Sequence, residues 1–598
     1  MVPEKPLPFV GKFSSTEEYL QKLLDFVTSS SQFNVFCGGV HILDFFTTKP
    51  SLFHYAVPEE WHPFVLECDI MRLLDLMVRE DLDSFVYEGE HQPPESFMEY
   101  IRTVRELSLS RTFSPPEKED PPLSRLVKKG MNAKKSHEVR NFAGYVTRLS
   151  DDIGSREGGS EISHFVDFGS GQNYLGRALA SEPYNRNVIA VEGRDHNVAA
   201  AKVRDFGSGL AVKPAVMRNK KLWLKVLELA GPGWKDDPER LAKAVKEVAG
   251  DEAFEFRSHK AVGAEAVYEN TPDMGSVQYI SGRLDSGDLS EVIAGIDRTK
   301  LSDEEKQRLN LMAVSIHSCG NLSHYAIKSL LLNEDIRAVA IVGCCYNLLT
   351  ERLGPPSYKH PCLRPSLQAI NGRVVRESAK RDSEGFPMSS RFSTYAGEGI
   401  RLNITARMMA CQAVQNWSRE DSEAFFTRHW YRAVLQKIFL DRGVVTKISH
   451  APGASAENGN GLVQEDASPL DASTSPVIIG SVPKSSYNSF RTYVHAAIEK
   501  LCANSEFKTQ GELMRDKMDG LTDEQIDEYE RTYLPRRKEV AVTWSMMAFS
   551  AIIVESLIVS DRWMFLKEQS EVVDEAWVEP VFDFKQSPRN LVVVGIKK

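Results

Sequence analysis

The sequence predicts an α/β protein with a doubly wound, mostly parallel sheet that ends in an antiparallel β-hairpin. The first observation is a strand at residues 163–168, followed by a glycine-containing turn, a helix at residues 174–180 and a second strand at residues 187–192. A strand–helix–strand unit of this kind is right-handed and has parallel strands. The second and third observations are further strand–helix pairs and a closing pair of strands joined by a short turn. The remaining strands are expected at residues 276–280, 311–316, 336–342, 577–584 and 591–596.

The rest of the chain predicts segments arranged around this sheet. Residues 1–122 have apolar side chains at helical spacing and form a helical N-terminal region. The sheet begins in residues 123–447, which contain a charged insertion at about 211–272. Residues 448–480 are rich in Ala, Ser, Gly and Pro and are expected to be a disordered loop. Residues 481–598 complete the sheet with its closing hairpin.

The composition is that of an ordinary globular protein. The 598 residues are 42% hydrophobic and 26% charged, which excludes a wholly disordered, collagen-like or disulfide-scaffold chain. The formal charge of −10 argues against a protein that holds nucleic acid by overall charge, but it leaves room for a local basic groove. Eight cysteines, two of them adjacent, favour a reducing compartment.

One apolar segment, residues 540–560, is about long enough to span a membrane. It contains Glu555 and is followed directly by Asp561 and Arg562, and ionisable residues are costly at membrane depth. We therefore expect a buried core helix and no membrane association. The N-terminal residues lack the pattern of a signal peptide, so we expect a soluble intracellular protein, cytoplasmic or nuclear.

The strongest motif is Asp-Phe-Gly-Ser-Gly at Asp167 to Gly171, at the end of the first predicted strand. Its glycines, Gly169 and Gly171, let the backbone turn sharply and approach a ligand closely, and the following helix N-terminus favours polar or anionic groups. Glu192 stands at the tip of the next strand, where a carboxylate can accept hydrogen bonds from both ribose hydroxyls of a nucleoside. The pattern predicts a site for a nucleoside-containing cofactor.

Two classes of enzyme use a turn of this kind. In nicotinamide enzymes the usual pattern is Gly-x-Gly-x-x-Gly, and the third glycine would fall here at Tyr174, which is too large for close helix–strand packing. An acid at the head of the motif is instead typical of class I S-adenosylmethionine methyltransferases, whose fold is Rossmann-like. The alternative is a nucleotide-like turn that has lost its ligand.

A second group of residues follows two later strands. His317 and Cys319 end one strand, and Cys344, Cys345 and Tyr346 follow the next, so that all five are expected around one crevice. They can face the substrate, supply a general base in His317, bind a metal, or pack as small, soft side chains. Because the Cys-x-x-Cys knuckle of structural zinc is absent, we expect no metal.

Several segments resemble the methyltransferase-like protein 25 family, including its branch of ribosomal-RNA adenine dimethylase-domain proteins. The resemblance covers about residues 125–598 and is carried by residues 134–139, 167–171, 317–322, 343–346, 385–389 and 555–562. The His-x-Cys-Gly and Cys-Cys-Tyr motifs are also similar, more distantly, to those of the tRNA 2′-O-methyltransferases that modify the acceptor stem. The chain departs from the adenine dimethylases because His-Ser-Cys-Gly stands where they have a Pro-Pro-aromatic element.

The resemblance implies a class I fold and methyl transfer from S-adenosylmethionine. By position, Gly169 and Gly171 line the methionine end of this cofactor, and Asp167 supports their loop. Glu192 binds the ribose. The adenine amino group is assigned to Asp285, with Asp288 as an alternative and a turn or helix-capping role equally open for both.

The resemblance also gives roles to the second group of residues. His317 is expected to deprotonate or orient the nucleophile, with a satisfied strand-end histidine as the alternative. Cys319, Cys344 and Tyr346 are expected to line the substrate crevice. For Lys135 and His137, on the helix before the first strand, solvation or helix capping is expected rather than catalysis.

The methyl acceptor is not evident from the sequence, and RNA is slightly favoured over protein. Basic stretches at residues 125–135, 218–223 and 536–538 can contact a phosphate backbone, and Trp223 can stack on a base, although most charge runs are solvated faces. The second function hypothesis is a non-catalytic adaptor that keeps the fold and binds a protein partner through its helical N-terminal region.

Overall fold

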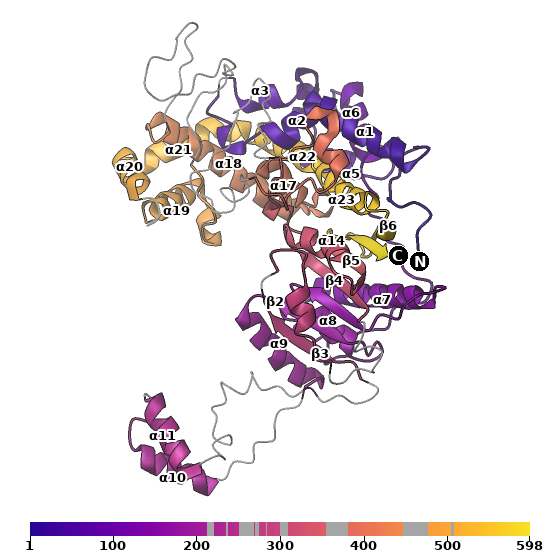
Figure 1. The fold of residues 1–598 in the computed structure, drawn as a ribbon. Helices are drawn as coiled ribbons and strands as arrows, with labels where there is room; N and C mark the ends of the chain where they lie inside the picture. Colours follow the sequence, from indigo (N-terminus) through magenta and orange to yellow (C-terminus); the bar gives the residue numbers. More distant parts are fainter. Residues whose placement is uncertain are drawn as a thin grey trace.

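The computed structural model combines an α/β unit with a lobe of helices (Figure 1). It describes residues 1–48, 50–211, 220–234, 237–249, 268, 274–282, 284–298, 309–353, 381–445, 477–503 and 508–598. Residues 448–476 of the expected disordered loop, and parts of the 211–272 insertion, lie outside the described residues.

The α/β unit is built on a seven-stranded sheet in the order β3-β2-β1-β4-β5-β7-β6. Strands β1 to β5 pair in parallel, and β7 is antiparallel to both β5 and β6. The predicted doubly wound, mostly parallel sheet with a C-terminal antiparallel pair is confirmed. The strands are β1 (His164–Phe168), β2 (Val188–Glu192), β3 (Val277–Ser281), β4 (Leu311–Ser318), β5 (Ile336–Gly343), β6 (Val573–Pro580) and β7 (Leu591–Lys597).

Helices cover both faces of the sheet because its buried strands are apolar on both sides. Along β1, Phe165 packs with α7 and α8 on one face, while Val166 belongs to the core formed with α12, α14 and α23 on the other. Successive side chains of a strand point to opposite faces, which produces this alternation. The helices around the sheet are α7 (Ala133–Ser155), α8 (Tyr174–Ala180), α9 (Asp195–Ser208), α12 (Ser290–Ala294), α14 (Leu322–Leu332) and α23 (Ile552–Lys567).

The helical lobe joins the N-terminal helices to helices from the second half of the chain, above the sheet in Figure 1. Helix α22 packs against α3, α4 and α5, and α19 and α21 pack against α18, so much of the segment that we assigned to the end of the sheet lies in the helical lobe. Of residues 481–598, α23, β6 and β7 pack onto or extend the sheet. The helices of the lobe are α1 (Thr16–Ser29), α2 (Ser31–Asn34), α3 (Leu52–Ala56), α4 (His62–Glu67), α5 (Ile70–Val78), α6 (Glu95–Glu106), α16 (Ser390–Thr394), α17 (Ile404–Ala410), α18 (Arg419–Asp441), α19 (Phe490–Cys502), α20 (Lys508–Met518), α21 (Asp523–Tyr533) and α22 (Arg537–Ser550).

The apolar segment at residues 540–560 forms the end of α22 and the start of α23. This segment belongs to a continuous helical stretch, Asp523–Lys567, that is long and apolar enough to cross a membrane. The most apolar part of that stretch is 94% buried inside the protein. Glu555 within it is paired with the guanidinium groups of Arg111 and Arg589. The segment has the surroundings of a core helix, as its charged residues predict.

The helix before the sheet and the closing pair of strands each have a boundary set by local structure. Helix α7 begins at Ala133, because Gly130 adopts φ +87° and the Asn132 side chain caps the helix by accepting from the Lys135 amide at 2.7 Å. Strand β6 ends at Pro580, and a ten-residue loop, 581–590, replaces the expected short turn. This loop folds back onto α7 and α23.

Part of the 211–272 insertion forms a helical pair, α10 (Lys220–Ala230) and α11 (Pro238–Ala249). The two helices pack against each other around Val226, Ala230 and Ala244.

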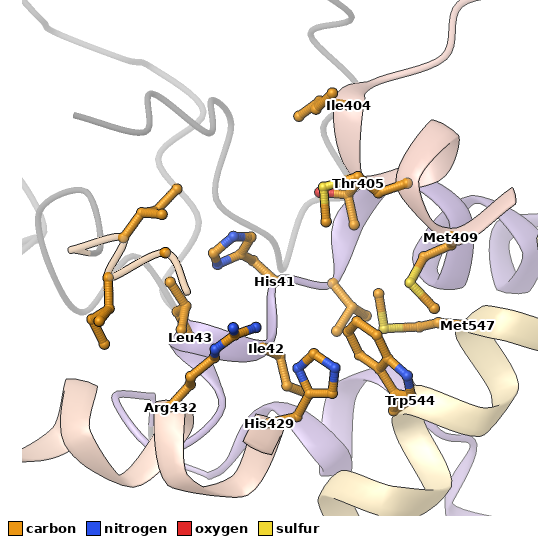
Figure 2. A pocket seen from close by; sticks show the side chains of 15 residues that line it. His41, Ile42, Leu43, Ile404, Thr405, Met409, His429, Arg432, Trp544 and Met547 are labelled. Carbon is orange, nitrogen blue, oxygen red and sulfur yellow. The ribbon is translucent and has the colours of Figure 1, made fainter. Parts of the chain in front are cut away.

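A cavity of about 210 Å³ lies inside the helical lobe (Figure 2). Its walls are mainly apolar and include Ile42, Met409 and Trp544, and the His429 ring stacks on Trp544 at a centroid distance of 3.5 Å. Burial lowers the pKa of His429 well below its usual value, so this imidazole is neutral. Every lining residue belongs to the lobe, which separates this cavity from the strand ends described next.

Candidate active site

The glycine turn after β1 has the backbone conformation that its sequence requires. Gly169 and Gly171 adopt φ values of +69° and +57°, and Asn173 adopts +53° at the start of α8. Asparagine tolerates this left-handed region better than most residues, so the turn survives without a third glycine. The Gly169 amide donates to the Val191 carbonyl at 3.0 Å, which ties the turn to the end of β2.

The two glycines face different surroundings. A Cβ at Gly169 would lie 2.9 Å from Cδ2 of Leu322 at the start of α14, whereas a Cβ at Gly171 would have no neighbour within 4 Å. The backbone at Gly171 therefore borders open space, as a turn that a ligand approaches closely must.

Glu192 lies directly beside this turn. Its Oε2 accepts from the Gly171 amide at 2.8 Å, and its Oε1 accepts from the Arg194 amide at 3.0 Å. The residue is only 8% exposed. The two hydrogen bonds orient the carboxylate at the carboxyl end of β2, next to the open face of the glycine turn.

Asp167 is buried under the turn. Burial raises the pKa of this carboxyl to about 7, an effect that the charge of Lys135 opposes and that of Glu192 reinforces. Asp167 therefore lies in electrostatic contact with both the glycine turn and α7.

The two acids after β3 have different surroundings. Asp285 is exposed on the loop beyond the strand end. Asp288 caps the start of α12, because its Oδ1 accepts from the Ser290 amide at 2.9 Å and from the Ser290 hydroxyl at 2.5 Å. Asp288 therefore has the helix-capping role, and Asp285 does not share it.

His317, near the end of β4, is joined to α7. Its Nε2 lies 3.0 Å from Oε2 of Glu138, a fully buried carboxylate that also contacts Lys135 Nζ at 3.1 Å and the Ser587 hydroxyl at 2.8 Å. Burial alone raises the pKa of Glu138, but the hydrogen bonds from His317 and Ser587 and the charges of His317 and Lys135 lower it to about 2. The His317 side chain is 36% exposed, so it stands between a buried anion and solvent.

Glu138 is a site residue that the sequence analysis missed. It belongs to the 134–139 segment that resembles the family, yet attention went to Lys135 and His137. The signal was present, since Glu138 falls among the apolar positions of an amphipathic helix, where a charged side chain needs a partner. His137 points to the β6–β7 loop instead, where its Nε2 accepts from the Asp583 amide at 3.0 Å.

The three thiols expected at the strand ends come together. The Sγ atoms of Cys319 and Cys344 are 3.2 Å apart, and those of Cys319 and Cys345 are 3.3 Å apart. The Cys344–Cys345 distance is 3.4 Å. Hydrogen bonds from the thiols of Cys319 and Cys344 lower the pKa of Cys345.

Tyr346 turns away from this group into the protein. It is 2% exposed, and its hydroxyl donates to Glu555 Oε1 at 2.7 Å. The same carboxylate pairs with Arg111 and Arg589. Tyr346 therefore belongs to a buried ionic cluster behind the strand ends.

A polar cleft of about 760 Å³ lies along the part of α7 that carries His137. It is bordered by the linker after α6, by His137 and Arg140 on α7, and by the β6–β7 loop from Asp583 to Gln586. The cleft is large enough to admit part of a polar substrate.

The strand order, the glycine turn and the acid at the tip of β2 define a class I, Rossmann-like methyltransferase fold. A family model described as a methyltransferase domain matches residues 134–352, which include α7, the glycine turn, His317 and the three thiols. The chain is similar in sequence to members of the methyltransferase-like protein 25 family.

Two curated relatives carry that name. The chain is 24% identical over 533 residues to "Probable methyltransferase-like protein 25" of Mus musculus, covering 78% of this chain and 75% of the relative. It is 23% identical over 531 residues to the Homo sapiens protein of the same name, with the same coverage of each chain. No solved structure matches the chain.

Proposed function

We propose that this protein transfers a methyl group from S-adenosylmethionine to an acceptor, with RNA favoured over protein. The observation that carries the proposal is the contact between the glycine turn and Glu192. It sets a carboxylate and an open stretch of backbone side by side at the carboxyl edge of a parallel sheet.

The residues present fit this cofactor. The open face of Gly171 admits a ligand against the backbone, and the oriented Glu192 carboxylate suits the two ribose hydroxyls. Asp285 is exposed after β3, where an adenine amino group can reach it. Asp167 supports the turn from below and Gly169 packs it against α14.

S-adenosylmethionine supplies an already activated methyl group, so the protein needs little acid–base machinery. Its residues align the two reactants and keep water out. In this proposal His317 accepts or orients the proton of the acceptor, and Glu138 holds the imidazole by its Nε2 atom. Cys319 and Cys344 border the acceptor side of the crevice.

RNA as acceptor is supported by the surface beside the glycine turn. The Tyr174 hydroxyl at the start of α8 donates to the Gly130 carbonyl at 3.0 Å, which holds a basic loop close to the cofactor edge. The exposed basic residues of this loop and the start of α7 are Arg125, Lys128, Lys129 and Lys134. Such a patch suits a phosphate backbone.

The basic stretch at residues 536–538 does not add to this argument. Arg536 and Arg537 are paired with Glu539 and Glu423, and Lys538 donates to a backbone carbonyl. These charges are satisfied within the helical lobe.

The cofactor assignment is tested by calorimetric titration with S-adenosylmethionine and S-adenosylhomocysteine, with NADH as the control ligand. We expect micromolar binding of the first two only. Glu192→Ala should weaken that binding at least tenfold, about 1.4 kcal/mol. The matched control is Glu157→Ala, which removes an exposed acid beyond the C-terminal end of α7. This variant should bind S-adenosylmethionine as the wild type does. Absence of binding to a folded protein would favour the adaptor hypothesis.

The acceptor assignment is tested by incubating the protein with radiolabelled S-adenosylmethionine and separate RNA and protein fractions. We expect label in the RNA fraction. His317→Ala should lose this incorporation while it keeps cofactor affinity. Label only in protein would overturn the RNA assignment, and full activity of the variant would remove His317 from the reaction.

A further inference from the structure

The three thiols at the ends of β4 and β5 form a compact group that methyl transfer does not require. Cys319, Cys344 and Cys345 each offer one sulfur, and all three atoms lie within 4.8 Å of one another. Among the His, Cys, Asp and Glu side chains of the described residues, these three form the group that lies close enough together to hold a metal ion. We propose that these cysteines bind a Zn²⁺ ion through their sulfur atoms and leave its fourth coordination position open.

The geometry supports this assignment. The three sulfur–sulfur distances of 3.2, 3.3 and 3.4 Å describe an almost equilateral triangle. Its centre lies about 1.9 Å from each corner, less than the Zn–S bond of about 2.3 Å, so an ion sits outside the sulfur plane. Tetrahedral zinc needs thiolates roughly 3.8 Å apart, and the group has to open by only about half an ångström.

The backbone holds the three donors in place. Ser318 of β4 pairs with Gly343 of β5, so Cys319 and Cys344 directly follow two paired strand residues. Cys319 is followed by Gly320, which adopts φ +56° and packs so tightly on Leu348 that a side chain there would clash. The donors therefore come from the rigid ends of two neighbouring strands, not from a free loop.

Charges nearby favour anionic sulfur. The buried guanidinium of Arg562 lies against Gly343, the residue before Cys344, and its bonded partner is the neutral Ser323 hydroxyl at 2.6 Å. Three thiolates and one divalent ion carry one net negative charge, which the positive charge of Arg562 offsets.

Soft thiolates select zinc or copper(I) over hard cations, and the all-sulfur set excludes a magnesium or calcium site. Three protein ligands with one open position distinguish this arrangement from the four-ligand structural zinc sites. The ion would connect the ends of β4 and β5 and fix the segment that carries His317. This inference does not depend on the identity of the methyl donor or acceptor.

The test measures zinc in the full-length protein purified under reducing conditions. After dialysis we expect about one equivalent of Zn²⁺ per chain, and an added chromophoric chelator should remove it with a stability loss. Cobalt(II) substitution should give the intense visible bands and sulfur charge-transfer absorption of tetrahedral thiolate coordination. Cys345→Ser and Cys344→Ser should each weaken zinc binding at least a hundredfold, with unchanged far-ultraviolet circular dichroism.

Cys411→Ser is the matched control. Its thiol lies nearby, 3.5 Å from the Asn347 Oδ1 atom, but outside the group of three. We expect it to keep zinc, and loss of zinc in this variant would overturn the open fourth position. A folded, reduced wild-type protein that retains no zinc and shows no cobalt spectrum would overturn the site. A disulfide between two of the three cysteines in freshly reduced protein, found by mass spectrometry, would do the same.

Discussion

The imidazole of His317 and the carboxylate of Glu138 meet at 3.0 Å although 179 residues separate them in the chain. The contact joins the end of β4 to α7, the helix that precedes the sheet. It fixes the ring of His317 by one nitrogen, while the rest of the side chain reaches the solvent-exposed edge of the site. In the proposed reaction, this contact would keep the His317 imidazole in one orientation.

Removal of the Glu138 charge should weaken the fold in a pH-dependent way. The pKa of Glu138 is lowered to about 2, so its stabilising contribution is present above about pH 4.5 and is lost as the pH falls towards 2. We expect Glu138→Gln to lower the free energy of unfolding by about 3 kcal/mol at pH 7, and by little at pH 2. Urea unfolding across this range measures both values.

The matched control for this pH dependence is Glu157→Gln, which changes an exposed acid beyond the end of the same helix. Its unfolding curves should follow those of the wild type at every pH. Parallel pH profiles for Glu138→Gln and the wild type would show that the buried carboxylate carries no linked stability.

Asp167 should show the opposite dependence. Burial raises its pKa to about 7, so the stability present below about pH 4 is lost as the pH rises to and through 7. An amide at this position cannot ionise. The free energy of unfolding of Asp167→Asn should therefore exceed that of the wild type by as much as about 4 kcal/mol above pH 7. Thermal unfolding at pH 5 and pH 8 tests this, with the exposed Asp574→Asn as control. A constant difference between the two pH values would contradict the raised pKa.

Glu555 holds two buried arginines. It pairs with Arg111 and Arg589, whose side chains are 12% and 9% exposed. Glu555→Ala leaves both guanidinium groups without this partner, and we expect a loss of about 3–5 kcal/mol in chemical denaturation. Glu423→Ala breaks the surface pair with Arg537 and should cost less than about 1 kcal/mol. Equal effects of the two changes would mean that the buried cluster contributes no more than a surface pair.

The two glycines of the turn should separate folding from ligand binding. Gly171→Ala meets no neighbour, so we expect a cost of only about 1–2 kcal/mol for its positive φ together with at least tenfold weaker S-adenosylmethionine binding. Gly169→Ala should destabilise more, because its Cβ crowds Leu322. Thermal unfolding and calorimetry measure the two effects.

Gly207→Ala supplies the control for these glycine changes. Gly207 lies inside α9, and an added Cβ there has open space. We expect the free energy of unfolding of this variant to rise by up to about 1 kcal/mol, because alanine favours a helix over glycine. Its affinity for the cofactor should equal that of the wild type. Unchanged affinity in Gly171→Ala would remove the turn from the cofactor site.

The sheet was predictable because its signals are local. The continuous apolar runs of the strands, the glycines of the turn and the acid at the tip of β2 are each visible within a few residues. The helical lobe was harder, because its packing joins the N-terminal helices to α22, more than 400 residues later. Hydrophobic periodicity shows that a helix is amphipathic but does not identify the element that covers it.

The sequence by itself determined the doubly wound, mostly parallel sheet with its closing antiparallel pair, the glycine turn followed by Glu192, and the gathering of His317 and the cysteines at one edge. Only the tertiary structure decided that Glu138 orients His317, that Tyr346 turns into the ionic cluster of Glu555, and that three thiols form one triangle. The physical reason is that backbone conformation and strand polarity follow from neighbours in the chain. The direction of a side chain depends on partners that the fold brings from far away.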